Sequence, residues 1–280
     1  MKVSTIIILC LLQKLIPHIE SQSFIDSFLL EEQRNIDENS FLTSETRIVG
    51  GRETERGRYP YQVALMQGHK DTPFCGGTLI HPQWVLTAGH CYGFVDKVQI
   101  GRHDFTDSFD TYEEIDISFE VRHPEYSSFP LQQDYMLVYL AIPSTYAPVK
   151  LDDGFVDLDP GLDLTVMGWG VSSYNSEILS DVLKEVEVDY MPRSFCRLAY
   201  IFSIGGVTKE MICARRNGQD ACKGDSGGPL IVKGKDSTED VQVGIVSWGW
   251  GCALLYFPGV YARISEGMDF IRSYVPLDEV

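Results

Sequence analysis

The 280-residue sequence has no apolar run long enough to cross a membrane, no Cys-x-x-Cys pair, no Asn-x-Ser/Thr sequon and few basic residues. A membrane-spanning helix needs about 20 apolar residues, and the longest apolar run here has roughly ten. Without a Cys-x-x-Cys pair a zinc site is disfavoured, and without a sequon we expect no N-glycan. The 23 lysines and arginines against 40 acids give a formal charge of −17, which disfavours nucleic-acid binding.

The first residues have the pattern of a secretory signal peptide. Lys2 is positively charged, an apolar run follows over residues 3–12, and Ser21 and Ser23 are small residues suited to cleavage. A buried N-terminal helix is the alternative. We expect residues 1–21 to be a signal peptide and the mature protein to be secreted, extracellular and not bound to a membrane.

Seven cysteines are an odd number for an exported protein, but Cys10 lies within the predicted signal peptide. A secretory route favours oxidation, so we expect the others to form three disulfides, although spacing alone leaves the pairing open. The six that remain are Cys75, Cys91, Cys196, Cys213, Cys222 and Cys252.

Residues 22–46 are acidic and polar and carry no cysteine, so we expect an activation pro-segment over 22–47 that adds little to a core. After Arg47 the sequence changes to short β-branched runs separated by turns. A stretch rich in turn formers near 145–160 is a plausible domain seam. Strands are predicted at 98–100, 164–170, 184–191, 229–234 and 241–248.

Two stretches have a helical pattern, Pro192–Tyr200 and Ser265–Val275; in the second, apolar residues recur at helical spacing. Many short strands and few helices predict an all-β fold of the barrel or sandwich type.

The stretch QDACKGDSGGP, from Gln219 to Pro229, places one serine, Ser226, among glycines. Glycines allow backbone conformations that a β-carbon forbids, and they let a substrate carbonyl approach backbone N–H groups. A nucleophilic serine needs that access, donors for the oxyanion and a nearby base. A tight turn without chemistry is the alternative.

Of the six histidines, His90 is the best candidate for the base, because it follows an apolar run and precedes a cysteine that can fix it. The others lie in the predicted signal peptide, in polar stretches or before prolines. Asp134 opens the apolar run YMLVYL, so a half-buried carboxylate there could pair with an imidazole N–H. Alone, each signal is weak, since an aspartate before a strand is often a turn residue.

Taken together, the motifs resemble those of the trypsin-like, chymotrypsin-fold serine proteases. RIVGG, LTAGHC, QDYMLVYL, GWG, GDSGGP, SWG and PGVYARI occur in the order and approximate spacing of that family, over residues 48–280. The order His, Asp, Ser is also that of the family. The resemblance implies two six-stranded antiparallel β-barrels with a C-terminal helix and an active site between the barrels.

The resemblance also assigns roles to residues at the expected site. Ser226 would attack the scissile carbonyl, His90 would transfer the proton, and Asp134 would orient His90. The N–H groups of Gly224 and Ser226 would form the oxyanion hole. No cofactor is implied.

Members of this family are synthesised as zymogens, so the resemblance implies that an activating trypsin-like protease cleaves the chain after Arg47. The freed amine of Ile48 would then pair with Asp225, because an amine and a carboxylate can be buried together more readily than either alone.

Substrate preference would depend on Asp220, which lies six residues before Ser226 and would form the floor of the primary pocket. A buried carboxylate there selects Arg or Lys side chains. The absence of a hydroxyl at Ala221 tilts the expected preference toward Arg. The residues expected to line this pocket with Asp220 are Ala221, Ser247, Trp248, Gly249 and Gly259.

By the same resemblance the disulfides are Cys75–Cys91, Cys196–Cys213 and Cys222–Cys252. Two departures from the family stand out. Gly89 replaces the usual alanine before His90, which removes bulk and blocks nothing. Arg102 stands where calcium-binding trypsins have glutamate, so no metal is expected, although nearby acids leave calcium binding open.

The sequence therefore predicts a secreted, monomeric serine endopeptidase that acts on polypeptides after Arg or Lys and is bound by protein protease inhibitors. The alternative is a catalytically inactive protease homologue that acts as a binding or inhibitor protein. A non-peptidase esterase is less favoured, because an anionic pocket suits peptide substrates better than lipids.

Overall fold

The computed structural model describes residues 51–68, 70–129, 131–171, 178–201, 206–216, 224–249 and 257–277. All of them belong to one structural unit, Thr46–Val280; the other unit, Met1–Glu45, lies outside the described residues. Within the described ranges, no helix has the length and apolar character needed to cross a membrane.

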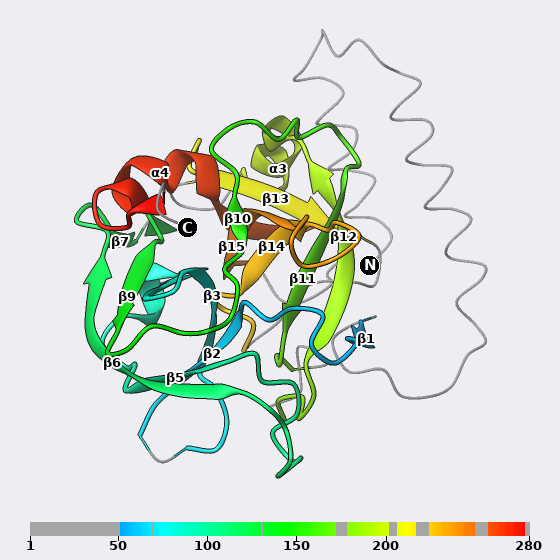
Figure 1. Ribbon diagram of the computed structural model, residues 1–280. Coiled ribbons are helices and arrows are strands. Elements are labelled where there is room, and N and C mark those ends of the chain that lie inside the picture. Colours follow the sequence, from blue (N-terminus) through cyan, green and yellow to red (C-terminus); the bar gives the residue numbers. More distant parts are fainter. Residues whose placement is uncertain are drawn as a thin grey trace, which may run out of the picture. The chain divides into compact units, whose positions relative to one another are not determined.

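Six antiparallel strands close into a first barrel, seen in the lower left of Figure 1. The strand order around the barrel is β2-β3-β4-β9-β6-β5. In strand β2 every residue is buried, so a short apolar run marks it rather than an alternating pattern. The strands are β2 (Gln62–Met66), β3 (Cys75–His81), β4 (Trp84–Thr87), β5 (Lys97–Ile100), β6 (Glu113–Arg122) and β9 (Met136–Leu140).

A second ring of six antiparallel strands follows the order β12-β11-β14-β15-β16-β13, and β13 pairs back with β12 to close it. Strand β15 is buried at all but its two end residues, again without alternation. The strands are β11 (Asp163–Gly168), β12 (Lys184–Met191), β13 (Met211–Arg215), β14 (Pro229–Val232), β15 (Val241–Trp248) and β16 (Gly259–Arg263).

Short elements attach to the two barrels. Strand β1 pairs with β12, strand β10 runs parallel to β15, and β7 and β8 form a hairpin just before β9. These elements are β1 (Arg52–Glu53), β7 (Ser127–Ser128), β8 (Leu131–Gln132), β10 (Lys150–Leu151) and the helices α3 (Arg193–Ala199) and α4 (Ile264–Arg272).

Helix α4 packs on the structure through an apolar face and a close contact at Gly267. A Cβ on Gly267 would lie 2.7 Å from the ring of Tyr135, so only glycine leaves space for that ring. The Tyr135 hydroxyl donates a hydrogen bond to the Arg263 carbonyl at 2.8 Å, and burial raises the pKa of this phenol. Because Tyr135 follows Asp134, this packing fixes the backbone beside a predicted site residue.

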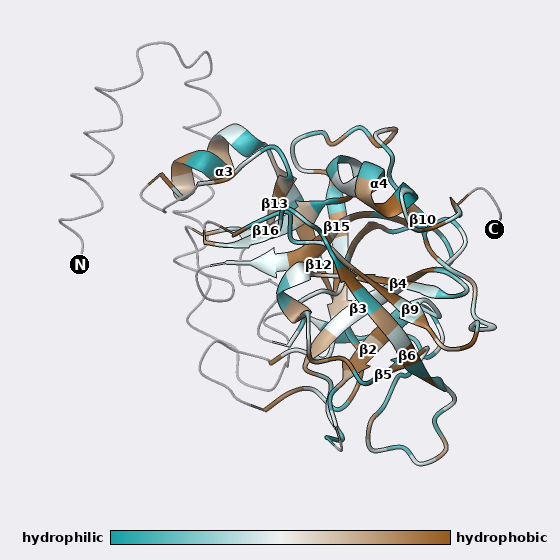
Figure 2. Ribbon diagram, turned by 90° about the vertical axis from the view of Figure 1, so that its left-hand side faces the viewer, coloured by the Kyte–Doolittle hydropathy of each residue, from teal (hydrophilic) through white to brown (hydrophobic). Residues whose placement is uncertain are grey.

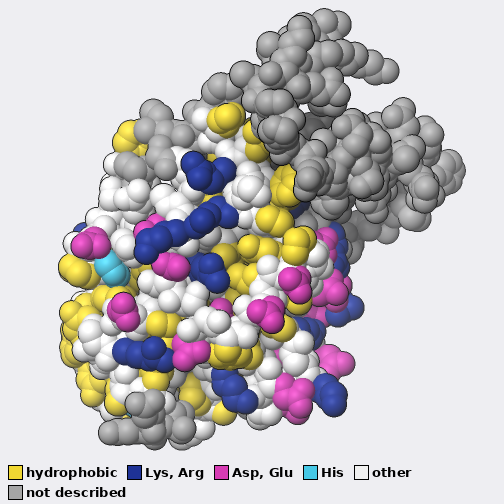
Figure 3. All heavy atoms as spheres, turned by 90° about the horizontal axis from the view of Figure 1, so that it is seen from above, with side chains coloured by type: hydrophobic (Ala, Val, Ile, Leu, Met, Phe, Trp, Pro, Cys, Tyr) yellow, Lys and Arg dark blue, Asp and Glu magenta, His cyan; other side chains and the backbone are white. Residues whose placement is uncertain are grey.

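The hydrophobic core continues from one barrel into the other. Met167, Ile231 and Ile245 of the second barrel belong to the same buried cluster as the side chains of the first barrel. Figure 2 shows the hydrophobic residues concentrated along the strands, whereas Figure 3 shows acidic and basic side chains interspersed over one face. The two barrels therefore share one buried core.

The predicted all-β architecture of two six-stranded barrels with a C-terminal helix is confirmed. The predicted strands lie at β5, β11, β12, β14 and β15, and the predicted helices at α3 and α4. The predicted boundaries of the signal peptide, the pro-segment and the seam near 145–160 stay predictions.

Candidate active site

His90 lies in a single 3-10 turn, Gly89–Cys91, that directly follows strand β4. Cys91 forms a disulfide with Cys75 at the start of β3, which ties the end of the turn to the barrel. The His90 side chain keeps 26% of its surface exposed. The turn therefore presents a partly exposed imidazole from a covalently anchored loop.

Asp134 meets His90 because β4 and β9 are antiparallel neighbours. Thr87 pairs with Met136, so the residues after β4 and those before β9 lie at the same edge of the barrel. The backbone N–H of His90 donates to Asp134 Oδ1 at 2.9 Å, and His90 Nδ1 lies 2.9 Å from Oδ2. With Nδ1–H donating to the carboxylate, Nε2 is left as the acceptor for a substrate-side proton.

The Asp134 carboxylate is only 3% exposed and has a third partner. The Ser247 hydroxyl, at the end of β15 in the second barrel, donates to Asp134 Oδ2 at 2.5 Å. Ser247 was expected only as a residue of the primary pocket, and the sequence contains no local signal for its contact with Asp134. Three donors therefore fix the position of this buried carboxylate beside the imidazole.

The Ser226 turn lies at the contact between the barrels. Pro229 pairs with Ile245, and the Gly227 N–H donates to the Val246 carbonyl at 2.9 Å, which places the turn beside Ser247. On the other side, the Gly76 N–H of strand β3 donates to the Ser226 carbonyl at 2.7 Å. Ser226 is thus held between the strand carrying Cys75 and the strand carrying Ser247.

Two glycines allow this placement of the turn. Gly224 and Gly227 have φ values of 97° and 80°, which favour glycine. A Cβ on Gly227 would also lie 2.6 Å from the Gly76 carbonyl and 3.2 Å from the backbone nitrogen of Ala88, two residues before His90. The Ser226 turn and the His90 turn are therefore near neighbours. Ser226 and His90 are both among the described residues, and no hydrogen bond joins the Ser226 hydroxyl to the His90 imidazole. The proton transfer from Ser226 to His90 therefore stays a prediction.

Asp225 is 1% exposed and lies against two glycines of the second barrel. Its Oδ1 accepts the Gly170 N–H at 2.8 Å, and a Cβ on either Gly168 or Gly170 would collide with the carboxylate. The predicted partner, the Ile48 amine, lies outside the described residues, as does Arg47. The Asp225 carboxylate therefore occupies space that only glycines at residues 168 and 170 leave open.

The predicted pocket is only partly within the described residues. Trp248 ends β15 and pairs with Val260 of β16, next to Gly259, so these predicted wall residues lie on neighbouring strands. The Trp248 ring packs edge-on against Tyr200, with centroids 4.8 Å apart. The expected floor, Asp220, and Ala221 lie outside the described residues, so their places stay predictions.

Two of the three predicted disulfides are confirmed, Cys75–Cys91 and Cys196–Cys213. The third, Cys222–Cys252, lies outside the described residues. In the described part of the chain, one group of side chains has metal-ligand proximity, Cys75, His90 and Cys91. Its two thiols form the disulfide bond, so the group does not offer thiolate ligands.

Comparison with known proteins agrees with this geometry. The trypsin family model matches residues 48–271. Trypsin 5G1 of Aedes aegypti is 38% identical over 82% of this chain and 86% of its own length. Serine protease 1 of Rattus norvegicus is 35% identical over 84% and 92%, and Trypsin-2 of Salmo salar is 35% identical over 84% and 97%. The chain belongs to the trypsin family of serine proteases.

Proposed function

We propose that this chain is a secreted serine endopeptidase, made as a zymogen and activated by cleavage after Arg47, that hydrolyses peptide bonds after Arg or Lys. The observation that carries the proposal is the double hydrogen bond between His90 and Asp134, at 2.9 Å from both the backbone and the ring. This arrangement fixes the imidazole tautomer that a general base needs.

In the proposed reaction the Ser226 oxygen attacks the scissile carbonyl while His90 Nε2 takes the hydroxyl proton. The backbone N–H groups of Gly224 and Ser226 stabilise the negative oxygen of the tetrahedral intermediate. His90 then protonates the leaving amine as the C–N bond breaks, which leaves an acyl ester on Ser226. Water, deprotonated by His90, then adds to the ester; the acyl C–O bond to Ser226 breaks, His90 returns the proton to the Ser226 oxygen, and the acid is released.

Activation follows from the buried position of Asp225. Cleavage after Arg47 by a trypsin-like protease frees the Ile48 amine, and a charged amine is a suitable partner for a carboxylate that is 1% exposed. Pairing of this amine with Asp225 would order the neighbouring backbone of Gly224 and Ser226, which supplies the oxyanion donors.

Substrate selection is assigned to the pocket with Asp220 as its floor. An anion there pairs with the terminal charge of an Arg or Lys side chain, while Trp248, Gly249 and Gly259 contact its apolar stem. The absence of a hydroxyl at Ala221 favours Arg over Lys. The protein's partners are then polypeptide substrates and protein protease inhibitors, and the enzyme acts as a monomer.

The test is a cleavage profile of a denatured proteome with the Arg47-cleaved protein and, as control, its Ser226→Ala variant. We expect cuts after Arg and Lys from the wild type only, with higher kcat/KM for Arg in matched substrates. Cuts after aromatic residues would contradict the assigned pocket. The absence of any cut would favour the alternative, an inactive homologue that binds or inhibits other proteins.

A further inference from the structure

The residue before His90 is a glycine whose missing side chain is replaced by an aromatic ring. A Cβ on Gly89 would lie 2.8 Å from Cδ2 of the Tyr126 ring and 3.1 Å from the Tyr135 carbonyl oxygen. Gly89 is not among the residues with positive φ, so the backbone conformation does not require glycine here. Space requires it, because the Tyr126 ring fills the volume that a methyl group would take. The expectation that Gly89 merely removes bulk is thus incomplete.

A guanidinium group lies over the Tyr126 ring. The Arg122 guanidinium carbon lies 4.6 Å from the centroid of the Tyr126 ring and 4.6 Å from that of Tyr92. Such contacts between a cation and a ring are attractive. Tyr92 follows Cys91 directly, so Arg122, from the end of strand β6, joins both ends of the His90 turn.

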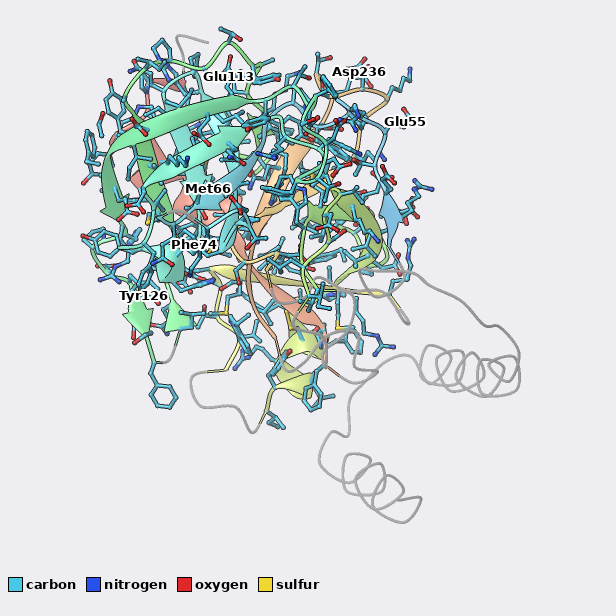
Figure 4. All side chains as sticks on the ribbon, turned by 90° about the horizontal axis from the view of Figure 1, so that it is seen from below. Glu55, Met66, Phe74, Glu113, Tyr126 and Asp236 are labelled. Carbon is cyan, nitrogen blue, oxygen red and sulfur yellow. A yellow bond between two sulfur atoms is a disulfide. The ribbon has the colours of Figure 1, made fainter. Side chains whose placement is uncertain are left out.

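Tyr126 also lies close enough to Asp134 to respond to its charge. Burial raises the pKa of the Tyr126 phenol, and the Asp134 carboxylate raises it further, whereas Arg122 opposes the change. Figure 4 shows Tyr126 beside the short strands of the β7–β8 hairpin, which leads into Asp134. The Tyr126 ring therefore packs against the turn that carries His90, and its hydroxyl lies within range of the Asp134 charge.

We propose that Tyr126, held by Arg122 and admitted by Gly89, is a positioning residue that sets the His90 imidazole against Asp134. The inference rests on the proposed function, because its kinetic consequences assume that His90 is the general base. A methyl group at residue 89 must displace either the clamped ring or the backbone of Tyr135, next to Asp134. Either shift changes the geometry of the His90–Asp134 pair.

A double-mutant cycle tests this coupling in the Arg47-cleaved protein. Gly89→Ala should lower kcat about 10- to 100-fold with little change in KM, since small misplacements of reacting groups cost rates of this order. Tyr126→Ala alone should lower kcat less, and in the Gly89→Ala background it should raise kcat again, because the methyl group then has room. Tyr126→Phe keeps the ring and should keep the wild-type rate.

Matched controls separate positioning from general damage to the surface. Phe129→Ala removes a ring that is 72% exposed on the same hairpin and should leave kcat unchanged. Arg122→Gln should produce a smaller loss of kcat than Gly89→Ala, because it loosens the ring without displacing it.

A spectroscopic measurement keeps the test independent of catalysis. The proton between His90 Nδ1 and Asp134 Oδ2 should give a low-field proton NMR signal, and we expect this signal to shift in Gly89→Ala and to return to its wild-type position in the double variant. If even the wild type hydrolyses no peptide, the proposed function fails while this signal still decides the inference. The positioning role of Tyr126 would be contradicted if Gly89→Ala kept the wild-type NMR signal and kcat. It would also be contradicted if the effects of Gly89→Ala and Tyr126→Ala on kcat were additive in the double variant. If Gly89→Ala does not fold, a wild-type NMR signal of the His90 Nδ1 proton in Tyr126→Ala would equally contradict the positioning role.

Discussion

Ser247 and Asp134 come from different barrels and share a hydrogen bond of 2.5 Å, from the Ser247 hydroxyl to Asp134 Oδ2. The same oxygen lies 2.9 Å from His90 Nδ1. The second barrel therefore contributes directly to holding the carboxylate that orients the imidazole of the first. Alignment of the proposed catalytic groups depends on the packing of the two barrels.

The first prediction concerns this bond. Ser247→Ala should lower kcat about tenfold, because hydrogen bonds to charged groups contribute roughly 1.5–3 kcal/mol and two donors to Asp134 remain. Steady-state kinetics on an Arg substrate measures it. Ser180→Ala is the matched control, since that buried hydroxyl donates to the Val182 carbonyl at 2.8 Å, away from Asp134. Equal effects on kcat in both variants would contradict the assigned role.

A second prediction concerns a buried ion pair. Asp240 is fully buried and accepts from Arg58 at 2.5 and 2.8 Å and from the Tyr61 hydroxyl at 2.5 Å. Asp240→Ala would leave the Arg58 guanidinium, whose side chain is 12% exposed, without its carboxylate partner, so the free energy of unfolding should fall by about 3 kcal/mol. Urea unfolding at neutral pH measures the change.

The exposed pair between Arg272 and Asp153, at 2.9 Å, provides the comparison for that experiment. Asp153→Ala should lower the free energy of unfolding by less than about 1 kcal/mol, as is usual for solvent-exposed pairs. Similar losses for Asp240→Ala and Asp153→Ala would show that burial of the first pair has been misjudged.

A third prediction concerns pH and His123, whose ring packs against Tyr135 and Phe270 at centroid distances of 5.9 and 4.8 Å. Burial lowers the pKa of His123, and the charge of Glu125 only partly opposes this. As pH falls below about 6.5, His123 takes up a proton in the unfolded chain before it does so in the folded chain. Protonation of His123 therefore lowers the free energy of unfolding as the pH falls.

Thermal unfolding at pH 7.5 and pH 5 can isolate that contribution. His123→Gln cannot take up the proton, so its melting temperature should fall less between the two pH values than that of the wild type. A wild-type-sized fall in the variant would assign the acid sensitivity to other groups.

A fourth prediction concerns Gln133, which has a positive φ of 49° directly before Asp134. Its side-chain oxygen is buried and has no hydrogen-bond partner in the described part of the chain. Non-glycine residues in this conformation lose roughly 1–2 kcal/mol, so Gln133→Gly should raise the free energy of unfolding by about 1 kcal/mol. Gln132→Gly, in strand β8, should instead lower the free energy of unfolding. A decrease in the free energy of unfolding in both variants would contradict backbone strain at Gln133.

Short apolar runs and turn residues mark strands locally, so the residue pattern predicted an all-β fold, and the two six-stranded barrels were implied by the resemblance to trypsin-like proteases. His90, Asp134 and Ser226 could be named because each lies in a recognisable motif. The Ser247–Asp134 bond could not be predicted, because it joins two residues 113 positions apart, and Ser247 lies where the pairing of β15 with β16 shifts register between Val246 and Trp248. Such contacts arise from packing between segments distant in sequence.

The contact between Gly89 and Tyr126 shows the same limit. The sequence shows that a methyl group is missing at residue 89, but not which side chain occupies its space. Only the folded chain brings the tyrosine, 37 residues later, against that glycine.

In the proposed reaction Ser226 is the nucleophile and His90 activates it. Treating the Arg47-cleaved protein with an organophosphate and mapping the modified peptide measures this directly. We expect about one label per chain, located on Ser226, and strongly reduced labelling in His90→Ala. Cleaved and folded wild-type protein that leaves Ser226 unlabelled would contradict the account.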